Sequence, residues 1–295
     1  MQTWRIFLQR IMNHIKQYAL LMRLHRPIGS LLLLWPTLWA LWIANHGKPN
    51  NFILIIFILG VFVMRSTGVI INDFADRKFD PHVKRTALRP LATGQVKPIE
   101  AIILFICLCF IALLLVLQLN LFTIKLSIIG LLLAIIYPFT KRFTHLPQLF
   151  LGAAYAWGVP MAFAAQNQPL SAICWLLYLA AVLWPIAYDT QYAMVDRADD
   201  LLIGVKSTAI LFGSYDRMII ALIQVAVLSM LWLIGYIVGL NYIYDLSLML
   251  ATMLVIYQQY LIKDRVPDKC FTAFLNNNWV GLIIFLGVML SYINN

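Results

Sequence analysis

Two clusters of acidic residues carry the strongest chemical signal in this sequence. The first is the run INDFADRKFD, in which Asn72, Asp76 and Asp80 follow one another at intervals of four residues. On a helix these side chains fall within about 80° of arc, so they point the same way. Carboxylate and amide oxygens suit Mg²⁺, which proteins commonly hold together with substrate phosphates. We therefore predict a magnesium site here, with Asp73 as a further ligand.

The second cluster lies in the run YDTQYAMVDRADD, which contains Asp189, Asp196, Asp199 and Asp200. The last three lie within about one helical turn, and Asp189 lies about two turns earlier. The two clusters together hold seven of the 12 acidic residues in the chain. Two unrelated charged surface turns are a poor explanation for that concentration. We predict that Asp196, Asp199 and Asp200 complete the metal site.

Basic residues accompany both clusters. The predicted ligands of a diphosphate are Lys84, Arg85 and Arg89 after the first cluster, with Lys141 and Arg142 at the end of an apolar stretch. Tyr137 precedes Lys141 by four residues, and Lys206 follows the second cluster. Metal ions ringed by Lys and Arg form a suitable site for a diphosphate. The alternative for each basic residue is that it only fixes the membrane topology.

Arg65 is a charged residue inside an apolar stretch. It precedes Asn72 by seven residues, so on a helix it shares that face about 10 Å deeper. A charge within a membrane span is costly and suggests a function by default. Two interpretations stay open: a structural ion pair with Asp73 or Asp189, or bidentate binding of a substrate carboxylate.

The elements that must position these residues are membrane helices. Of the 295 residues, 62% are hydrophobic and 12% are charged, and the mean hydropathy is +0.84. Soluble domains average about 45–50% apolar and about 25% charged residues. Nine apolar stretches are long enough to span a bilayer, at 28–45, 52–72, 99–118, 121–139, 147–165, 171–191, 218–239, 243–262 and 276–293. We predict one all-α domain over residues 1–295.

The distribution of Lys and Arg predicts the orientation. If the first span starts in the cytoplasm, all 22 basic residues lie on the cytoplasmic side except Lys48, Lys125 and the intramembrane Arg65. This bias predicts a cytoplasmic N-terminus, cytoplasmic acidic clusters and a C-terminus on the opposite side. The net charge of +10 therefore reflects topology, and nucleic acid is not an expected partner.

Residues 1–20 are predicted to form an amphipathic helix on the bilayer surface. Trp4, Leu8, Ile11, Ile15 and Tyr18 recur at helical spacing among basic residues. The segment lacks the continuous apolar core of a secretory signal.

Other site types have weak support. The four cysteines form no CxxC pair, and the five histidines share no spacing typical of metal ligands. The run GVKST at 204–208 lacks the full spacing of a P-loop.

Two long motifs resemble a known family. NDFADRKFD with VKRTALRPLATGQV, and YDTQYAMVDRADDLLIGVKST, resemble the two signatures of the UbiA-type intramembrane prenyltransferases. YPFTKRFTHLPQLFLGAAYAWGVPMAF resembles the segment between them, and MRLHRPIGSLLLLWPTLWALW resembles the first span of the branch that prenylates 4-hydroxybenzoate. The resemblance covers essentially the whole chain. His25 departs from it, because relatives usually carry an acidic residue there.

The resemblance implies nine spans around a central cavity, Mg²⁺ as cofactor and a polyprenyl diphosphate donor. Its motifs N-x-x-x-D-x-x-x-D, D-x-x-x-D and Y-x-x-x-K match residues 72–80, 196–200 and 137–141. The ubiquinone branch joins 4-hydroxybenzoate to a polyprenyl chain, which implies a bacterial inner-membrane enzyme. Asp196 or Asp189 is then expected to act on the phenol proton, and Arg65 on the benzoate carboxylate. Tyr137 completes the expected catalytic residues.

Three alternatives remain at this level. The acceptor is a naphthoate, homogentisate or haem in other prenyltransferases. A cation transporter also places acidic residues in its spans, although typically near the bilayer midplane. A non-catalytic scaffold would not need seven clustered aspartates. The sequence leaves the prenyl chain length, the number of metal ions and the oligomeric state open.

Overall fold

The chain folds into helices joined by short loops. The computed structural model describes residues 2–83 and 85–294, and no strand occurs in those ranges. The helices are α1 (Gln2–Leu21), α2 (Ile28–Ala44), α3 (Asn51–Asp76), α4 (Pro98–Val116), α5 (Leu121–Thr140), α6 (Pro147–Ala156), α7 (Gly158–Ala165), α8 (Ala172–Ile203), α9 (Thr208–Phe212), α10 (Asp216–Val238), α11 (Tyr242–Leu261) and α12 (Pro267–Ile293). The predicted all-α class is confirmed.

The number of membrane spans also agrees with the sequence. Eight stretches among the described residues are long and apolar enough to cross a bilayer, and the 17-residue α2 adds a shorter ninth. One of the eight, Pro147–Ala165, consists of α6 and α7, which are divided at Trp157. The protein is an integral membrane protein. The N-terminal segment is helical over Gln2–Leu21, and its place on a membrane surface stays a prediction.

Several helices extend beyond the predicted apolar stretches. α3 continues to Asp76, α8 continues to Ile203, and α12 begins at Pro267, well before the predicted 276. Hydropathy reveals only the part of a helix that lipid can cover, so the polar turns at the loop ends were missed. These extra turns carry much of both acidic clusters.

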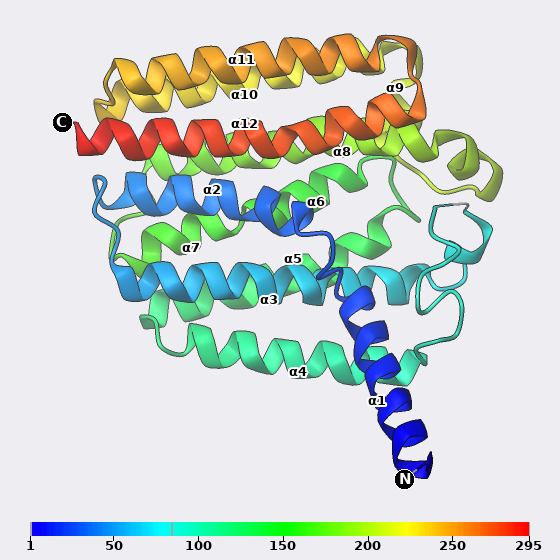
Figure 1. Cartoon of the computed structure of the whole chain (residues 1–295). Coiled ribbons are helices and arrows are strands. Elements are labelled where there is room, and N and C mark those ends of the chain that lie inside the picture. Colours follow the sequence, from blue (N-terminus) through cyan, green and yellow to red (C-terminus); the bar gives the residue numbers. More distant parts are fainter. Residues whose placement is uncertain (1, 84, 295) are drawn as a thin grey trace.

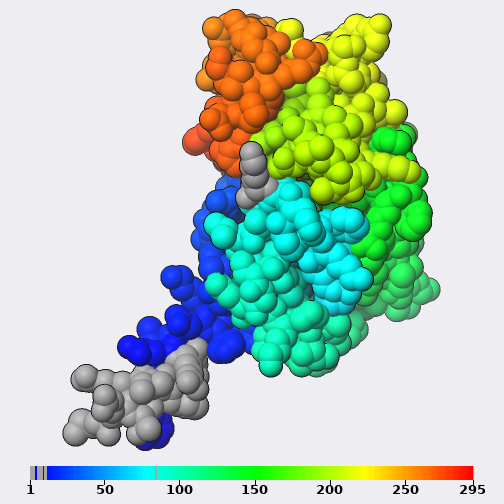
Figure 2. Space-filling view, turned by 90° about the vertical axis from the view of Figure 1, so that its right-hand side faces the viewer, coloured from blue at the N-terminus to red at the C-terminus, as the bar shows by residue number. Residues whose placement is uncertain are grey.

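The helices run side by side, and their functional loops meet at one end of the bundle (Figure 1). That end carries the connections after α3, α5 and α8, and Figure 2 looks onto it. The C-terminus lies at the opposite end, while α1 projects away from the bundle (Figure 1). The arrangement brings the predicted acidic clusters to one end, as expected because four spans, an even number, separate them.

Large aromatic residues fill the interior between α2, α8 and α12. The rings of Trp39 and Trp184 stack with their centroids 5.3 Å apart. Gly281 of α12 faces them, and a Cβ there would lie 2.3 Å from Cδ1 of Trp35. Any larger residue would therefore push α12 away from α2 and α8. This close packing places α8, which carries the second acidic cluster, near the centre of the bundle.

Candidate active site

A polar cavity of about 300 Å³ opens at the loop-bearing end of the bundle. Its walls come from α2, α3, the 77–97 loop, α5, α6, α8 and α12. Both acidic clusters contribute to the lining, with Asn72, Asp73, Asp76 and Asp80 from the first and Asp189, Asp196 and Asp200 from the second. Arg65, Arg85, Arg89, Tyr137 and Lys141 also line it. Residues that lie far apart in the sequence, from Arg65 to Asp200, thus line one cavity.

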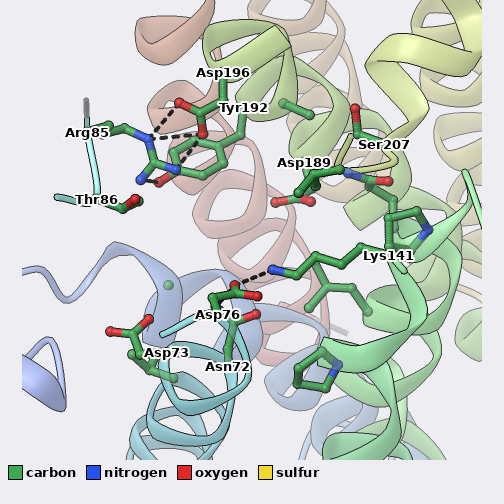
Figure 3. Close-up of a pocket in the computed structure, with 18 of the residues that line it drawn as sticks. Asn72, Asp73, Asp76, Arg85, Thr86, Lys141, Asp189, Tyr192, Asp196 and Ser207 are labelled. Atoms are coloured by element: carbon green, nitrogen blue, oxygen red, sulfur yellow. Dashed lines mark hydrogen bonds and ion pairs between the residues drawn. The ribbon is translucent and has the colours of Figure 1, made fainter. Parts of the chain in front are cut away.

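Asp76 lies at the middle of this cavity (Figure 3). Its Oδ2 forms an ion pair with Lys141 and accepts a hydrogen bond of 3.3 Å from Nδ2 of Asn72. Its Oδ1 is buried and has no hydrogen-bond partner. A buried carboxylate oxygen without a partner is costly unless a ligand satisfies it. Asp76 and Asn72 therefore provide oxygen atoms that fit a hard divalent cation.

Asp73 and Asp80 are held by arginines. Asp73 is 1% exposed and accepts hydrogen bonds of 3.0 and 3.1 Å from Arg23, and Arg89 approaches it to 2.9 Å. The same Arg89 lies 2.9 Å from both oxygens of Asp80. Burial raises the pKa of Asp80 to about 6, although the neighbouring Arg89 opposes the rise. These contacts tie the 77–97 loop and the connection between α1 and α2 to α3.

The position of Asp80 corrects the predicted helical spacing. α3 ends at Asp76, and Asp80 begins a separate 3-10 turn, Asp80–His82. The residue before a proline disfavours the α-helical conformation, and Pro81 follows Asp80. Asp80 nevertheless lines the cavity with Asn72 and Asp76, because the chain folds back over the end of α3.

Asp196 faces the first cluster from α8. Its carboxylate forms an ion pair with Arg85, whose Nε lies 2.9 Å from Oδ1 (Figure 3). The guanidinium of Arg85 also lies 4.5 Å from the ring centroid of Tyr192 and hydrogen-bonds to its hydroxyl. Arg85 therefore connects the 77–97 loop to α8 across the cavity. Two turns earlier on α8, Asp189 lines the same cavity, as does Gln148 of α6.

Two predicted residues, Arg142 and Asp199, do not line this cavity. Arg142 donates a 2.6 Å hydrogen bond to the carbonyl of Ala75, and it is absent from the cavity lining. Lys141 and Arg142 follow the end of α5 at Thr140, and of the two only Lys141 lines the cavity. Asp199 is absent from the lining, because adjacent residues of a helix point about 100° apart and its neighbour Asp200 faces inward. Lys84 lies outside the described residues.

Arg65 is deeply buried beneath the acidic clusters. It forms no ion pair within residues 2–83 and 85–294, which argues against the alternative of a structural ion pair with Asp73 or Asp189. Its Nε has no hydrogen-bond partner. Gly29 makes room for it, because a Cβ at that position would lie 2.4 Å from both Nε and Nη2 of Arg65. An unpaired guanidinium in this position is suited to bind an anionic group of a ligand.

A second cavity of about 270 Å³ continues from the first between α2, α3, α4, α5, α6 and α7. Apart from a few residues its lining is apolar, and it shares Arg65, Tyr137 and Tyr155 with the polar cavity. Gly60 and Gly68 line it, and a Cβ at either position would meet nothing within 4 Å. The two cavities together can take a ligand with a polar head and an apolar tail.

Several lining residues were not predicted. They are Arg23, Gln148, Tyr155, Tyr188, Tyr192, Phe271 and Phe274. An aromatic residue in an apolar span gives no signal of its own, whereas the polar Gln148 at the start of α6 could have been noticed. His25, the departure from the family pattern, is exposed and absent from the lining, so it does not alter the cavity.

A metal ion in this cavity would need ligands from both the protein and the substrate. Among the described residues, no group of three or more His, Cys, Asp or Glu side chains converges to hold a metal ion. Mg²⁺ commonly binds through one or two carboxylates and completes its shell with water and substrate phosphates. Asn72, Asp76 and Asp196 fit such a partial ligand set.

Comparison with known proteins gives a consistent result. The sequence profile of the UbiA prenyltransferase family matches residues 33–286. A protein of Coxiella burnetii named 4-hydroxybenzoate octaprenyltransferase is 57% identical over 282 residues, covering 96% of this chain and 98% of the relative. A protein of the same name from Citrobacter koseri is 56% identical and covers 95% and 97% of the two chains.

Solved structures share the fold. The apo structure of a UbiA homolog from Aeropyrum pernix K1 superposes with a TM-score of 0.77 at 25% identity, covering 88% of this chain and 97% of that one. A UbiA homolog from Archaeoglobus fulgidus, bound to GPP and Mg²⁺, superposes with a TM-score of 0.70 at 15% identity, covering 92% and 99%.

Proposed function

The chain belongs to the UbiA prenyltransferase family, and from this premise we propose the reaction that it catalyses. The enzyme transfers a polyprenyl group from a polyprenyl diphosphate to the ring carbon ortho to the hydroxyl of 4-hydroxybenzoate. The reaction depends on Mg²⁺ and is a step of ubiquinone biosynthesis. The names of the two bacterial relatives support this choice of acceptor over a naphthoate, homogentisate or haem.

One observation carries the proposal: a polar cavity with two aspartate clusters and several cations adjoins an apolar cavity, and the two share three lining residues. A polyprenyl diphosphate has the same division between a charged head and an apolar tail. The cavities meet at Arg65, Tyr137 and Tyr155, so the reacting carbon next to the diphosphate would lie near this junction. A membrane interior around the junction keeps water from a reactive cation.

The acidic clusters hold the donor head. Asn72, Asp76 and Asp196 would bind Mg²⁺, with Asp80 and Asp200 within the same lining. When bound, Mg²⁺ would neutralise charge on the departing diphosphate as the allylic C–O bond breaks. Lys141, Arg85 and Arg89 supply fixed positive charge for the same oxygens. Arg85 and Lys141 exchange their carboxylate partners for diphosphate oxygens when the donor binds.

The acceptor binds below the donor head. Arg65 holds the benzoate carboxylate, and Asp189 accepts the phenol proton as the ring attacks the allylic carbon. The new C–C bond forms at the ortho carbon, and the diphosphate leaves with the electrons of the broken C–O bond. The ortho carbon then gives its proton to the released diphosphate and Asp189 returns the phenol proton to the oxygen, so the ring recovers its aromaticity.

The bacterial relatives and the charge pattern support the membrane placement that we propose. The chain is a single prenyltransferase domain in the bacterial inner membrane, with the acidic clusters and the N-terminus on the cytoplasmic side. The basic residues at the loop-bearing end support this orientation. The α1 helix lies on the bilayer surface.

The first test uses membranes that contain the full chain. They are incubated with labelled 4-hydroxybenzoate and a polyprenyl diphosphate, in Mg²⁺ or in EDTA, and the lipid extract is analysed by mass. We expect prenylated 4-hydroxybenzoate in Mg²⁺ and none in EDTA. No product from folded protein would reject this acceptor, and a screen of other aromatic acceptors would follow.

The apolar cavity predicts a dependence on donor length. Gly60→Phe would place a ring in the open space of that cavity, about 12 Å along α3 from Gly68. We expect kcat/KM for an octaprenyl donor to fall at least about tenfold, because filling the space obstructs a long tail. Turnover of a dimethylallyl donor should be unchanged, since its tail ends before Gly60. Rates with the two donors provide the measurement.

Leu59→Phe is the matched control for this prediction. Leu59 is the neighbouring residue on α3, is 48% exposed and does not line the cavity. This variant should have the same kcat/KM as the wild type for both donors. If Gly60→Phe lowered kcat/KM equally for the octaprenyl and dimethylallyl donors, the proposed position of the tail would be contradicted.

A further inference from the structure

A network of buried side-chain amides lies behind α8. Nε2 of Gln191 donates to Oε1 of Gln258 at 3.2 Å, and Nε2 of Gln224 donates to the same oxygen at 2.7 Å. Gln258 in turn donates to Asn276 at 3.0 Å. Unpaired amides are expensive in an apolar interior, so the network ties α8, α10, α11 and α12 into one arrangement.

Asn277 connects this network to α8 at two points. Its Nδ2 donates to Oε1 of Gln191 at 3.0 Å, and its Oδ1 accepts from Nε1 of Trp184 at 3.1 Å. Asn277 is 1% exposed. Trp184 and Gln191 are seven residues apart, which is two helical turns or about 10 Å. A single amide on α12 therefore spans two turns of α8.

The two turns between these contacts carry part of the polar cavity. Tyr188 and Asp189 lie there, and both line the cavity. The hydroxyl of Tyr188 is buried without a hydrogen-bond partner. Pro185 lies in the same segment, and a proline removes one backbone hydrogen bond and allows a helix to bend. This weakened segment depends on outside contacts for its direction.

We propose that Asn277 is a positioning residue, which holds Trp184 and Gln191 so that Tyr188 and Asp189 face the aromatic acceptor. Asn277 does not line the cavity, and its two side-chain partners both belong to α8. The inference rests on the proposed function in one respect, namely that the acceptor binds beside Tyr188 and Asp189.

The metal-binding end of α8 has a separate anchor. Asp216 is fully buried and forms ion pairs with Arg197 and with Arg265, the latter at 2.8 Å. Arg197 follows Asp196 directly in the chain. This anchor keeps Asp196 in place when the contacts of Asn277 are lost. The donor end of the cavity should therefore be spared in variants of Asn277.

The test compares Asn277→Leu and Gln191→Leu with the wild type in steady-state kinetics. We expect the KM for 4-hydroxybenzoate to rise roughly tenfold or more in each, because a small misplacement of binding groups has effects of that size. The KM for the polyprenyl diphosphate should stay within about twofold. The double variant should be less impaired than the sum of the two single effects, since both variants lose the same hydrogen bond between Asn277 and Gln191.

Asn278→Leu is the matched control. Asn278 is the next residue on α12, and its Oδ1 accepts a 3.0 Å hydrogen bond from Nε1 of Trp35 on α2. The substitution therefore removes the same kind of bond without touching α8. It should lower the unfolding temperature less than Asn277→Leu, because Asn277 makes two such side-chain hydrogen bonds and Asn278 makes one. It should leave the KM for 4-hydroxybenzoate unchanged.

Three results would overturn the inference: a parallel rise of both KM values, equal effects of Asn277→Leu and Asn278→Leu, or additive effects of Gln191→Leu and Asn277→Leu. If Asn277→Leu does not fold, Gln191→Met on α8 replaces it, and the same two KM values are compared. Wild-type protein that forms no product from 4-hydroxybenzoate would instead reject the proposed function. Wild-type turnover with unaffected variants would reject only the role of Asn277.

Discussion

Replacing Asp76 or Asp196 with alanine is expected to lower kcat/KM for prenyl transfer by roughly 100-fold or more. Each change removes a carboxylate from the centre of the polar cavity, and charge stabilisation at a departing group has effects of this size. Asp76 also presents the buried oxygen that has no protein partner. Initial rates of purified, reconstituted protein over a range of Mg²⁺ concentrations give the measurement.

Asp264→Ala is the control for these variants. Asp264 is an exposed carboxylate in the turn after α11, outside the cavity lining, and its loss should leave the rate unchanged. Size-exclusion profiles and unfolding temperatures establish that the cavity variants remain folded. Wild-type turnover in both Asp76→Ala and Asp196→Ala would contradict the proposed role of these two residues in binding Mg²⁺.

The second large effect concerns Arg65. Arg65→Met should raise the KM for 4-hydroxybenzoate at least about 30-fold, because losing one partner of a buried charge pair costs about 2–5 kcal/mol. Arg65→Lys should be intermediate, since an ammonium keeps the charge and loses the bidentate geometry. The KM for the donor should change little. Steady-state kinetics with each substrate varied in turn separate the two constants.

Two further comparisons make the role of Arg65 specific. Phenol lacks the carboxylate, so Arg65→Met should prenylate it as slowly as the wild type does. Gly29→Ala keeps Arg65 but puts a methyl group 2.4 Å from its present position, which forces the guanidinium to move. It should show the same selective rise in KM, to a smaller extent. A loss with phenol as large as that with 4-hydroxybenzoate would contradict carboxylate binding.

Helix α3 illustrates what the sequence could predict. The spacing of Asn72 and Asp76 placed both on one helical face, and the structure has them hydrogen-bonded there. The same reasoning extended the helix to Asp80, which in fact follows the end of α3 in a 3-10 turn. Spacing describes side chains within one helix, and it cannot describe a chain that folds back over the helix end.

Contacts between distant helices were beyond sequence reasoning. Arg23 was assigned to topology alone, yet it binds Asp73, 50 residues away, and it lines the cavity. Arg142 was expected beside Lys141 in the site, whereas it turns to the carbonyl of Ala75. A basic residue near a membrane surface has the same sequence signal in either role. Only the packing of neighbouring helices decides between them.

The side-chain amides within α8, α11 and α12 could have been used to predict contacts between helices. Gln191, Gln258 and Asn277 stand in otherwise apolar spans, where polar residues are rare and costly. Their presence pointed to contacts between helices, and the structure joins them in one network. Which helices they would join was not predictable, since each amide can pair with any other.

The contrast between α4 and α8 bears on how substitutions accumulate in this protein during evolution. Only 6% of the apolar window of α4 is buried inside the bundle, compared with 56% for α8. Lipid accepts almost any apolar side chain, so the outer face of α4 can drift among Leu, Ile, Val and Phe under little selection. Its inner face, which includes Ala112 and Val116, borders the apolar cavity and is constrained by the volume that remains there. Substitutions that alter donor length without harming folding should therefore collect on one side of a single peripheral helix.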